Sequence, residues 1–416
     1  MKYVILHGAG MAAMAQKDLA GKTPLQAAAT PNMDLLARKG ELGQLVVHAD
    51  GLPFGSELTE LSLLGYDPRK AFTGPAPLEA ASLGVSVEEH DTVYRCDMVS
   101  FRMSSPQGGS ALEADIKKLG PQVLMDDEAA GGIASEEARE LLEAVNEQLG
   151  SETIQFYPGS GHRHLMVWVN GKFRATCANP RMIIDKPVTE FLPNGEGSDI
   201  LRKIMEASLV ILRDHPVNDQ RREAGLKPVH CLWLWGQGRA PRLASLTERL
   251  QITGAIASTD DLHRGIGMSV GLEGLRLDTS TDDYGADFHH QAKAALAELK
   301  KKDLVYVHAT VPNEVSRGTD AKVRLKALEA FDQKLVGAVM DGLPKLGAHR
   351  VLLVCDYAPE VGTPAGPTPP APFAFYEGPA QDKKSGAKGF SEVEAQASAA
   401  GVREATKLLA RLCTRP

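Results

Sequence analysis

Short apolar runs separated by amphipathic segments organise this chain. Four of these runs are continuous rather than alternating and end at polar or glycine-rich loops, which is typical of strands buried on both faces. They lie at residues 3–6, 231–235, 304–307 and 351–354. Helical periodicity follows them, at 30–38, 200–213, 291–300 and 322–340. This alternation predicts an α/β fold with a doubly wound sheet, and a ligand site at the carboxyl ends of its strands.

A stretch of different texture interrupts the alternation between residues 88 and 194. It contains a polar loop rich in serine and glycine, an Ala/Glu-rich helix at 135–149 and a strand-like segment at 163–169. A chain of 416 residues is long for one simple core. We therefore expect 88–194 to form a smaller α+β cap domain, inserted into a core domain made of residues 1–87 and 195–416.

Composition and charge limit the classes of partner that this protein is expected to bind. The hydrophobic fraction of 43% is ordinary for a folded globular protein, and the net charge of -7 comes with scattered basic residues. This pattern predicts no binding to nucleic acid or to a membrane. The five cysteines form no metal-binding or disulfide spacing, and the N-terminal apolar strand lacks a cleavage site, so we expect a cytoplasmic protein.

Several ordered motifs resemble one family. They are Gly-Lys-Thr-Pro-Leu at 21–25, Thr-Pro-Asn-Met-Asp at 30–34, Leu-Ser-Leu-Leu-Gly-Tyr-Asp-Pro at 61–68, Pro-Leu-Glu-Ala-Ala-Ser-Leu-Gly at 77–84 and Trp-Leu-Trp-Gly-Gln-Gly at 233–238. The chain resembles the archaeal-type, 2,3-bisphosphoglycerate-independent phosphoglycerate mutases and their proposed homoserine-kinase-like relatives, across nearly its whole length. The resemblance implies an alkaline-phosphatase-like core, a mutase-type cap and metal-assisted phosphoryl transfer through a serine.

The resemblance also implies a degenerate metal site. In the family, two divalent cations (Mn, Zn or Mg) hold the phosphoryl oxygens. The family serine is carried over as Ser56, the candidate nucleophile, and one metal-binding aspartate as Asp356. The remaining metal positions fall at Ala9, Asn313, Arg317, Tyr357 and Gly366. Since alanine cannot ligate a metal and arginine adds a fixed positive charge, the resemblance predicts that no metal cofactor is bound.

Each of these residues also has a simpler interpretation. Ser56 could cap the N-terminus of a helix, and Asp356 could bond loop amides. His7 could act as a base for Ser56, or could be a packed histidine at a strand end. Three arginines are candidates for binding a phosphate or carboxylate ligand: Arg163, Arg264 and Arg317.

These observations lead to two hypotheses of function. The first is a catalytically inactive homologue that acts in ligand binding, in regulation or as a partner subunit of another protein. The alternative is an active phosphoglycerate mutase or related phosphotransferase that uses Ser56 with a rebuilt metal site. Replacement ligands would distinguish them, but His289 and His290 lie in a polar segment, and His308 is a residue that the family also carries.

Overall fold

The computed structural model describes residues 1–48, 51–52, 55–104, 116–277, 284–311, 321–357, 369–379 and 385–414. It divides the chain into two compact units. The core unit consists of Met1–Phe72 and Arg242–Pro416, and the second unit is Thr73–Pro241. Within the described residues, no helix is both long and apolar enough to cross a membrane.

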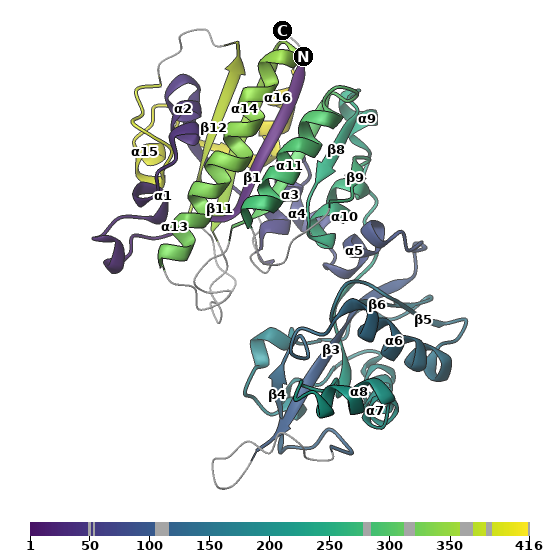
Figure 1. Ribbon diagram of the computed structural model, residues 1–416. Helices are drawn as coiled ribbons and strands as arrows, with labels where there is room; N and C mark the ends of the chain where they lie inside the picture. Colours follow the sequence, from purple (N-terminus) through teal and green to yellow (C-terminus); the bar gives the residue numbers. More distant parts are fainter. Residues whose placement is uncertain are drawn as a thin grey trace. The chain divides into compact units, whose positions relative to one another are not determined.

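The core unit is built on an eight-stranded sheet with the order β13-β2-β12-β11-β1-β10-β8-β9 (Figure 1). Its strands are β1 (Lys2–Ala12), β2 (Glu41–Val46), β8 (Gly254–Ala257), β9 (Glu273–Leu275), β10 (Leu304–Thr310), β11 (His349–Tyr357), β12 (Ala371–Gly378) and β13 (Val402–Glu404). The central pairs β1–β10, β1–β11 and β10–β8 are parallel, whereas β12 runs antiparallel to both of its neighbours. The apolar runs at 3–6, 304–307 and 351–354 lie inside β1, β10 and β11, as predicted.

Helices cover both faces of this sheet, which confirms the predicted doubly wound α/β class. One layer holds α2, α11, α13 and α14, and the other holds α3, α10 and α16 (Figure 1). The bounds of the core helices are α1 Pro24–Ala27, α2 Pro31–Lys39, α3 Ser56–Leu63, α4 Pro68–Ala71, α9 Leu246–Leu250, α10 Asp261–Ser269, α11 Tyr284–Glu298, α13 Ala321–Ala330, α14 Ala338–Gly342, α15 Glu392–Gln396 and α16 Ala405–Cys413.

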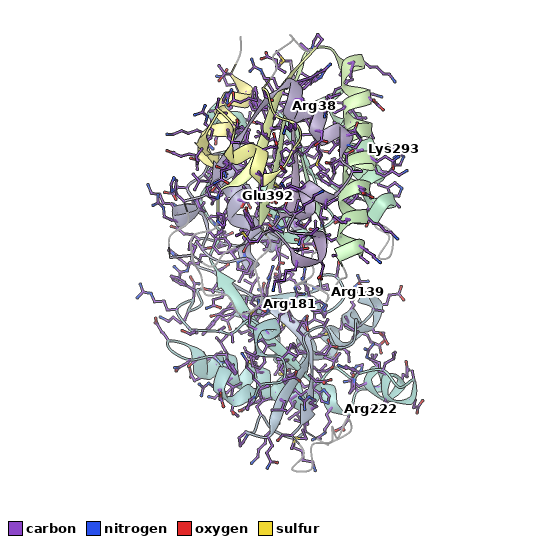
Figure 2. The ribbon with its side chains drawn as sticks, turned by 90° about the vertical axis from the view of Figure 1, so that its left-hand side faces the viewer. Arg38, Arg139, Arg181, Arg222, Lys293 and Glu392 are labelled. Carbon is purple, nitrogen blue, oxygen red and sulfur yellow. The ribbon has the colours of Figure 1, made fainter. Side chains whose placement is uncertain are left out.

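The buried carboxylate of Glu392, labelled in Figure 2, holds α15 against the chain that follows β1. It accepts hydrogen bonds from the Thr23 hydroxyl at 2.6 Å and from the Ala13 amide at 3.0 Å. In contrast to the buried Glu392, the side chains of Arg38 on α2 and Lys293 on α11 are exposed (Figure 2). The segment at the end of β1, which carries part of the site below, is therefore fixed by buried polar contacts.

The second unit is an antiparallel α+β unit. Its five-stranded sheet has the order β4-β3-β6-β5, with β7 paired to β3. The bounds are α5 Ala76–Leu83, β3 Thr92–Met103, β4 Val123–Asp127, α6 Ser135–Leu149, β5 Ile154–Tyr157, β6 Arg163–Trp168, α7 Ser198–Arg213, α8 Pro216–Glu223 and β7 Cys231–Gly238. The expected helix at 135–149 coincides with α6, and the strand at 163–169 corresponds to β6.

The second unit is larger than the expected insertion of residues 88–194. The apolar run at 231–235 belongs to β7, which pairs antiparallel with β3 instead of joining the core sheet. Helix α7 packs on β7, so the helix that was expected to cover the core sheet also lies in this unit. Hydrophobic pattern alone cannot separate the two sheets, because a strand covered on both faces is continuously apolar in either one.

Candidate functional site at the carboxyl ends of the central strands

Three parallel strands bring buried polar side chains to one face of the core sheet. In the β1–β10 register His7 lies opposite His308, and in the β1–β11 register it lies opposite Val354. Side chains alternate between the two faces of a strand. Tyr306 lies two residues before His308 and Asp356 two residues after Val354, so both share the face of His7. All four polar side chains are buried. Polar groups in such a place must bond to one another or to a ligand.

Both ring nitrogens of His7 are bonded. Nε2 lies 3.0 Å from Asp356 Oδ2, and Nδ1 lies 2.9 Å from the Tyr306 hydroxyl. Burial raises the pKa of Tyr306 well above its usual value, so this hydroxyl stays protonated and can donate to Nδ1. Nε2 can then donate to the carboxylate. His7 therefore orients Asp356 and has no nitrogen left to act as a base on Ser56.

The carboxylate of Asp356 connects β11 to β1 and lies near α3. Its Oδ1 accepts the amide hydrogen of Gly10 at 2.6 Å. Burial alone would raise the pKa of Asp356, but His7, the Gly10 amide and the nearby Ser56 hydroxyl together lower it. Asp356 is thus an ionised carboxylate beside the candidate nucleophile. It bonds a loop amide, as one interpretation expected.

Ser56 is the first residue of α3, and the residue that caps this helix is Gly55. Ser56 is therefore not the cap residue of this helix, contrary to one interpretation. Its hydroxyl lies near Asp356 and lowers the pKa of that carboxyl. Its position also places it in the positive field of the helix N-terminus, which favours a phosphoryl group there.

A second group of buried side chains begins one helical turn further along α3. Glu60 Oε2 lies 2.5 Å from Nδ1 of His263, on α10. The His263 ring stacks on His308, with ring centroids 3.5 Å apart and planes at 15°. Burial alone lowers the pKa of His263, but the hydrogen bond and negative charge of Glu60 outweigh it and raise the pKa to about 9. One carboxylate and two imidazoles are thereby held together in the core.

The two groups form one continuous cluster. The rings of His7 and His308 make an edge-to-face contact, with centroids 5.3 Å apart. Burial and the neighbouring rings of His263 and His7 hold the pKa of His308 well below its usual value, so its ring is neutral. Glu60, His263 and His308 each offer one ligand atom, and these atoms lie within 4.8 Å of one another. Within the described residues, this is the group with the composition of a metal site.

The other residues singled out from the sequence have different surroundings. Ala9 is buried and presents only a methyl group, and Tyr357 is half-buried at the end of β11. Arg264 pairs with Asp261 on its own helix. Arg163 lies in the second unit, at the exposed start of β6. The remaining three positions, Asn313, Arg317 and Gly366, lie outside the described residues.

The comparisons with known proteins identify the family. The chain is 38% identical over 415 residues to a probable 2,3-bisphosphoglycerate-independent phosphoglycerate mutase of Geobacter sulfurreducens, covering all of both chains. The chain belongs to the 2,3-bisphosphoglycerate-independent phosphoglycerate mutase family. A mutase so named from Methanosarcina barkeri is 35% identical, with 98% of each chain covered, and residues 37–218 match the model of that family.

Two solved structures share the fold. A protein from Pyrococcus horikoshii superposes with a TM-score of 0.75 at 21% identity, covering 100% of this chain and 98% of its own. A cofactor-independent phosphoglycerate mutase from Thermoplasma acidophilum gives 0.60 at 20% identity, with 99% of both chains covered. The recognition of the family and of its fold from sequence motifs is thereby confirmed.

One expectation must be corrected. The family resemblance predicts that no metal cofactor is bound, because most family ligand positions carry other residues. Residues at other positions can supply ligands. The structure assembles Glu60, His263 and His308 into a group able to hold a metal ion, in a chain whose full-length relatives are named as phosphoglycerate mutases. Those names also favour the alternative of an active enzyme over the hypothesis of an inactive homologue.

Proposed function

We propose that this chain is an active phosphoglycerate mutase that transfers a phosphoryl group through Ser56. The observation that carries the proposal is the position of Ser56 at the first residue of α3, close enough to Asp356 for its hydroxyl to lower the pKa of that carboxyl. The Ser56 oxygen forms a bond to phosphorus while the bond from phosphorus to the substrate oxygen breaks, and the Ser56 proton passes to that leaving oxygen. The reverse transfer, to the neighbouring hydroxyl of the same molecule, restores the Ser56 hydroxyl. The names of the full-length relatives support this substrate.

The residues of the chain contribute orientation and charge. Asp356 lies beside the Ser56 hydroxyl and is itself fixed by His7 and by the Gly10 amide. The N-terminus of α3 directs a partial positive charge toward the position where the phosphoryl group would attach. The described family metal positions Ala9 and Tyr357 do not fit the two cations of the family, so no step is assigned to that pair of ions. A divalent cation bound elsewhere in the cluster would lower the pKa of the attacking hydroxyl and offset the phosphoryl charge.

The test is a mutase assay without 2,3-bisphosphoglycerate, with divalent cations supplied, on wild type and Ser56→Ala. We expect turnover by wild type and a loss of at least about 10³-fold in kcat for the variant, as is usual when a nucleophile is removed. Ser62→Ala is the matched control, since Ser62 lies on the same helix and its hydroxyl bonds only the Leu58 carbonyl, at 2.8 Å. An inactive wild type, or equal activity in Ser56→Ala, would refute the proposal.

A further inference from the structure

We propose that Glu60, His263 and His308 bind one divalent cation of the zinc class. The site differs from the family positions at Ala9, Asn313, Arg317, Tyr357 and Gly366. As a metal site it stands independently of the proposed function. As the source of positive charge for phosphoryl transfer, it rests on that function.

The donor set selects the class of ion. Two imidazole nitrogens and one carboxylate oxygen are the protein ligands of many catalytic zinc sites, in which a fourth position stays open to water or substrate. Imidazole donors favour zinc and the later first-row metals over magnesium or calcium, which prefer oxygen ligands throughout. Glu60, His263 and His308 are all buried, so water competes little for the ion.

Two ligand atoms have no partner among the described residues. Glu60 Oε1 and His308 Nε2 are both buried and unbonded. An unbonded carboxylate oxygen or imidazole nitrogen in a dry core costs about 1–3 kcal/mol or more, so natural structures rarely retain one without a ligand. Both atoms belong to the same three-residue group. This coincidence is the independent observation that points to a bound ion.

The hydrogen bonds of Ser258 prepare His308 as a ligand. The Ser258 hydroxyl donates to the Asp260 carbonyl at 3.3 Å and accepts the Asp260 amide at 3.1 Å. Its oxygen can then accept a hydrogen bond from His308 Nδ1, which lies 3.3 Å away. With the proton on Nδ1, the lone pair of His308 is on the unbonded Nε2. Metal-binding histidines are usually held by such an outer hydrogen bond.

The charges of the cluster suit a single dication. Glu60 and Asp356 supply two carboxylates, and the His7–His308 ring contact joins them in one buried cluster. A dication would bind in exchange for the proton that His263 shares with Glu60, and its charge would face both carboxylates. Because the rings of His263 and His308 are stacked, at least one ring must turn about its Cβ–Cγ bond for both to reach one ion. Such a rotation retains both side chains in the core.

The site lies next to the candidate nucleophile. Glu60 follows Ser56 by four residues on α3, so both side chains project from the same face of the helix. Asp356 lies near Ser56, and His7 bonds Asp356 while contacting His308. An ion held by Glu60 and His308 would therefore place positive charge beside the phosphoryl group on Ser56. This is the charge that the family obtains from ligands at other positions.

The experiment uses the untagged full-length chain, dialysed against a chelator and then titrated with Zn²⁺ or Co²⁺ alone. We expect wild type to bind one equivalent of either ion and to show the visible absorption bands of tetrahedral or five-coordinate Co²⁺. Glu60→Gln and His308→Gln should lose both the bound ion and these bands. Ser258→Ala should bind about 10- to 100-fold more weakly, as outer-shell changes do. His289→Gln/His290→Gln is the matched control, because that pair lies outside the group and should leave binding unchanged.

Circular dichroism distinguishes loss of the site from loss of the fold, since a folded variant keeps its helical signal. If wild type binds neither ion, or if folded Glu60→Gln and His308→Gln keep the equivalent, the inference is overturned. If Glu60→Gln does not fold, the folded Ser258→Ala variant still tests the inference. An affinity of Ser258→Ala for the metal ion equal to that of wild type would also overturn the inferred site. Ser56→Ala separates the two proposals: it should keep the metal and lose turnover. Metal binding without turnover in wild type would refute only the proposed function, whereas turnover in the presence of the chelator would refute the inferred role of the ion.

Discussion

Replacing the buried Asp97 of the second unit by asparagine should remove a pH-dependent loss of stability. Asp97 lies on β3, and its Oδ2 accepts the indole hydrogen of Trp235 at 2.7 Å. Its Oδ1 is buried without a partner among the described residues. Burial raises the pKa of Asp97 to about 6, although Arg95, Trp235 and Arg163 oppose the shift. The ionised form is therefore disfavoured in the folded state.

The sign and size of the effect follow from this shift. The unfolded chain releases the proton near pH 3.9, whereas the folded chain retains it up to about pH 6. Between these values the folded state binds more protons, so the free energy of unfolding falls as pH rises and then stays low. A difference of about 2 pKa units corresponds to about 3 kcal/mol. The free energy of unfolding of Asp97→Asn minus that of wild type should grow by about this amount from pH 4 to pH 7.

Tryptophan fluorescence during urea unfolding reports the free energy of unfolding of the second unit, because all three tryptophans lie there: Trp168, Trp233 and Trp235. Asp127→Asn is a control of opposite sign. Burial would raise the pKa of Asp127, but the amides of Ala129 and Gly131 and the Lys227 ammonium lower it, so this carboxylate stabilises the folded state above pH 4. A difference for Asp97→Asn that stays constant with pH would refute the reasoning.

Three further substitutions test the packing and orientation described above. His7→Phe should leave Asp356 and Tyr306 without their shared hydrogen-bond partner, which should lower the free energy of unfolding by about 1–3 kcal/mol per lost bond. It should also reduce kcat more than it changes KM, and a kcat equal to that of wild type would contradict the orienting role. Gly10→Ala should cost about 1–2 kcal/mol in thermal unfolding, because Gly10 has a φ of 77° and its amide bonds Asp356; an unchanged Tm would contradict it. Trp233→Ala should cost about 3–5 kcal/mol in urea unfolding, since this side chain is fully buried.

The sequence predicted the central strands and the site's location because continuous apolar runs carry a strong signal. Ser56 and Asp356 were found through family motifs, and they lie near one another. The assignment of β7 was wrong because an apolar run does not show which sheet it joins.

The metal-type group was missed for a different physical reason. Glu60 and His263 lie on two separate helices, and nothing in their spacing indicates that α3 and α10 bring them together. A signal did exist: His7 and His308 directly follow the predicted apolar runs of two neighbouring parallel strands, and the carboxyl ends of such strands meet. Combining that rule with the four-residue spacing of Ser56 and Glu60 on one helix face would have suggested the cluster.

The most direct test of phosphoryl transfer through Ser56 is mass spectrometry of the enzyme, quenched in acid during turnover of 3-phosphoglycerate. The account predicts a fraction of the chain carrying one phosphoryl group, located on the peptide that contains Ser56 and absent from Ser56→Ala. Turnover with the phosphoryl group on another residue, or with wild type never modified, would contradict it.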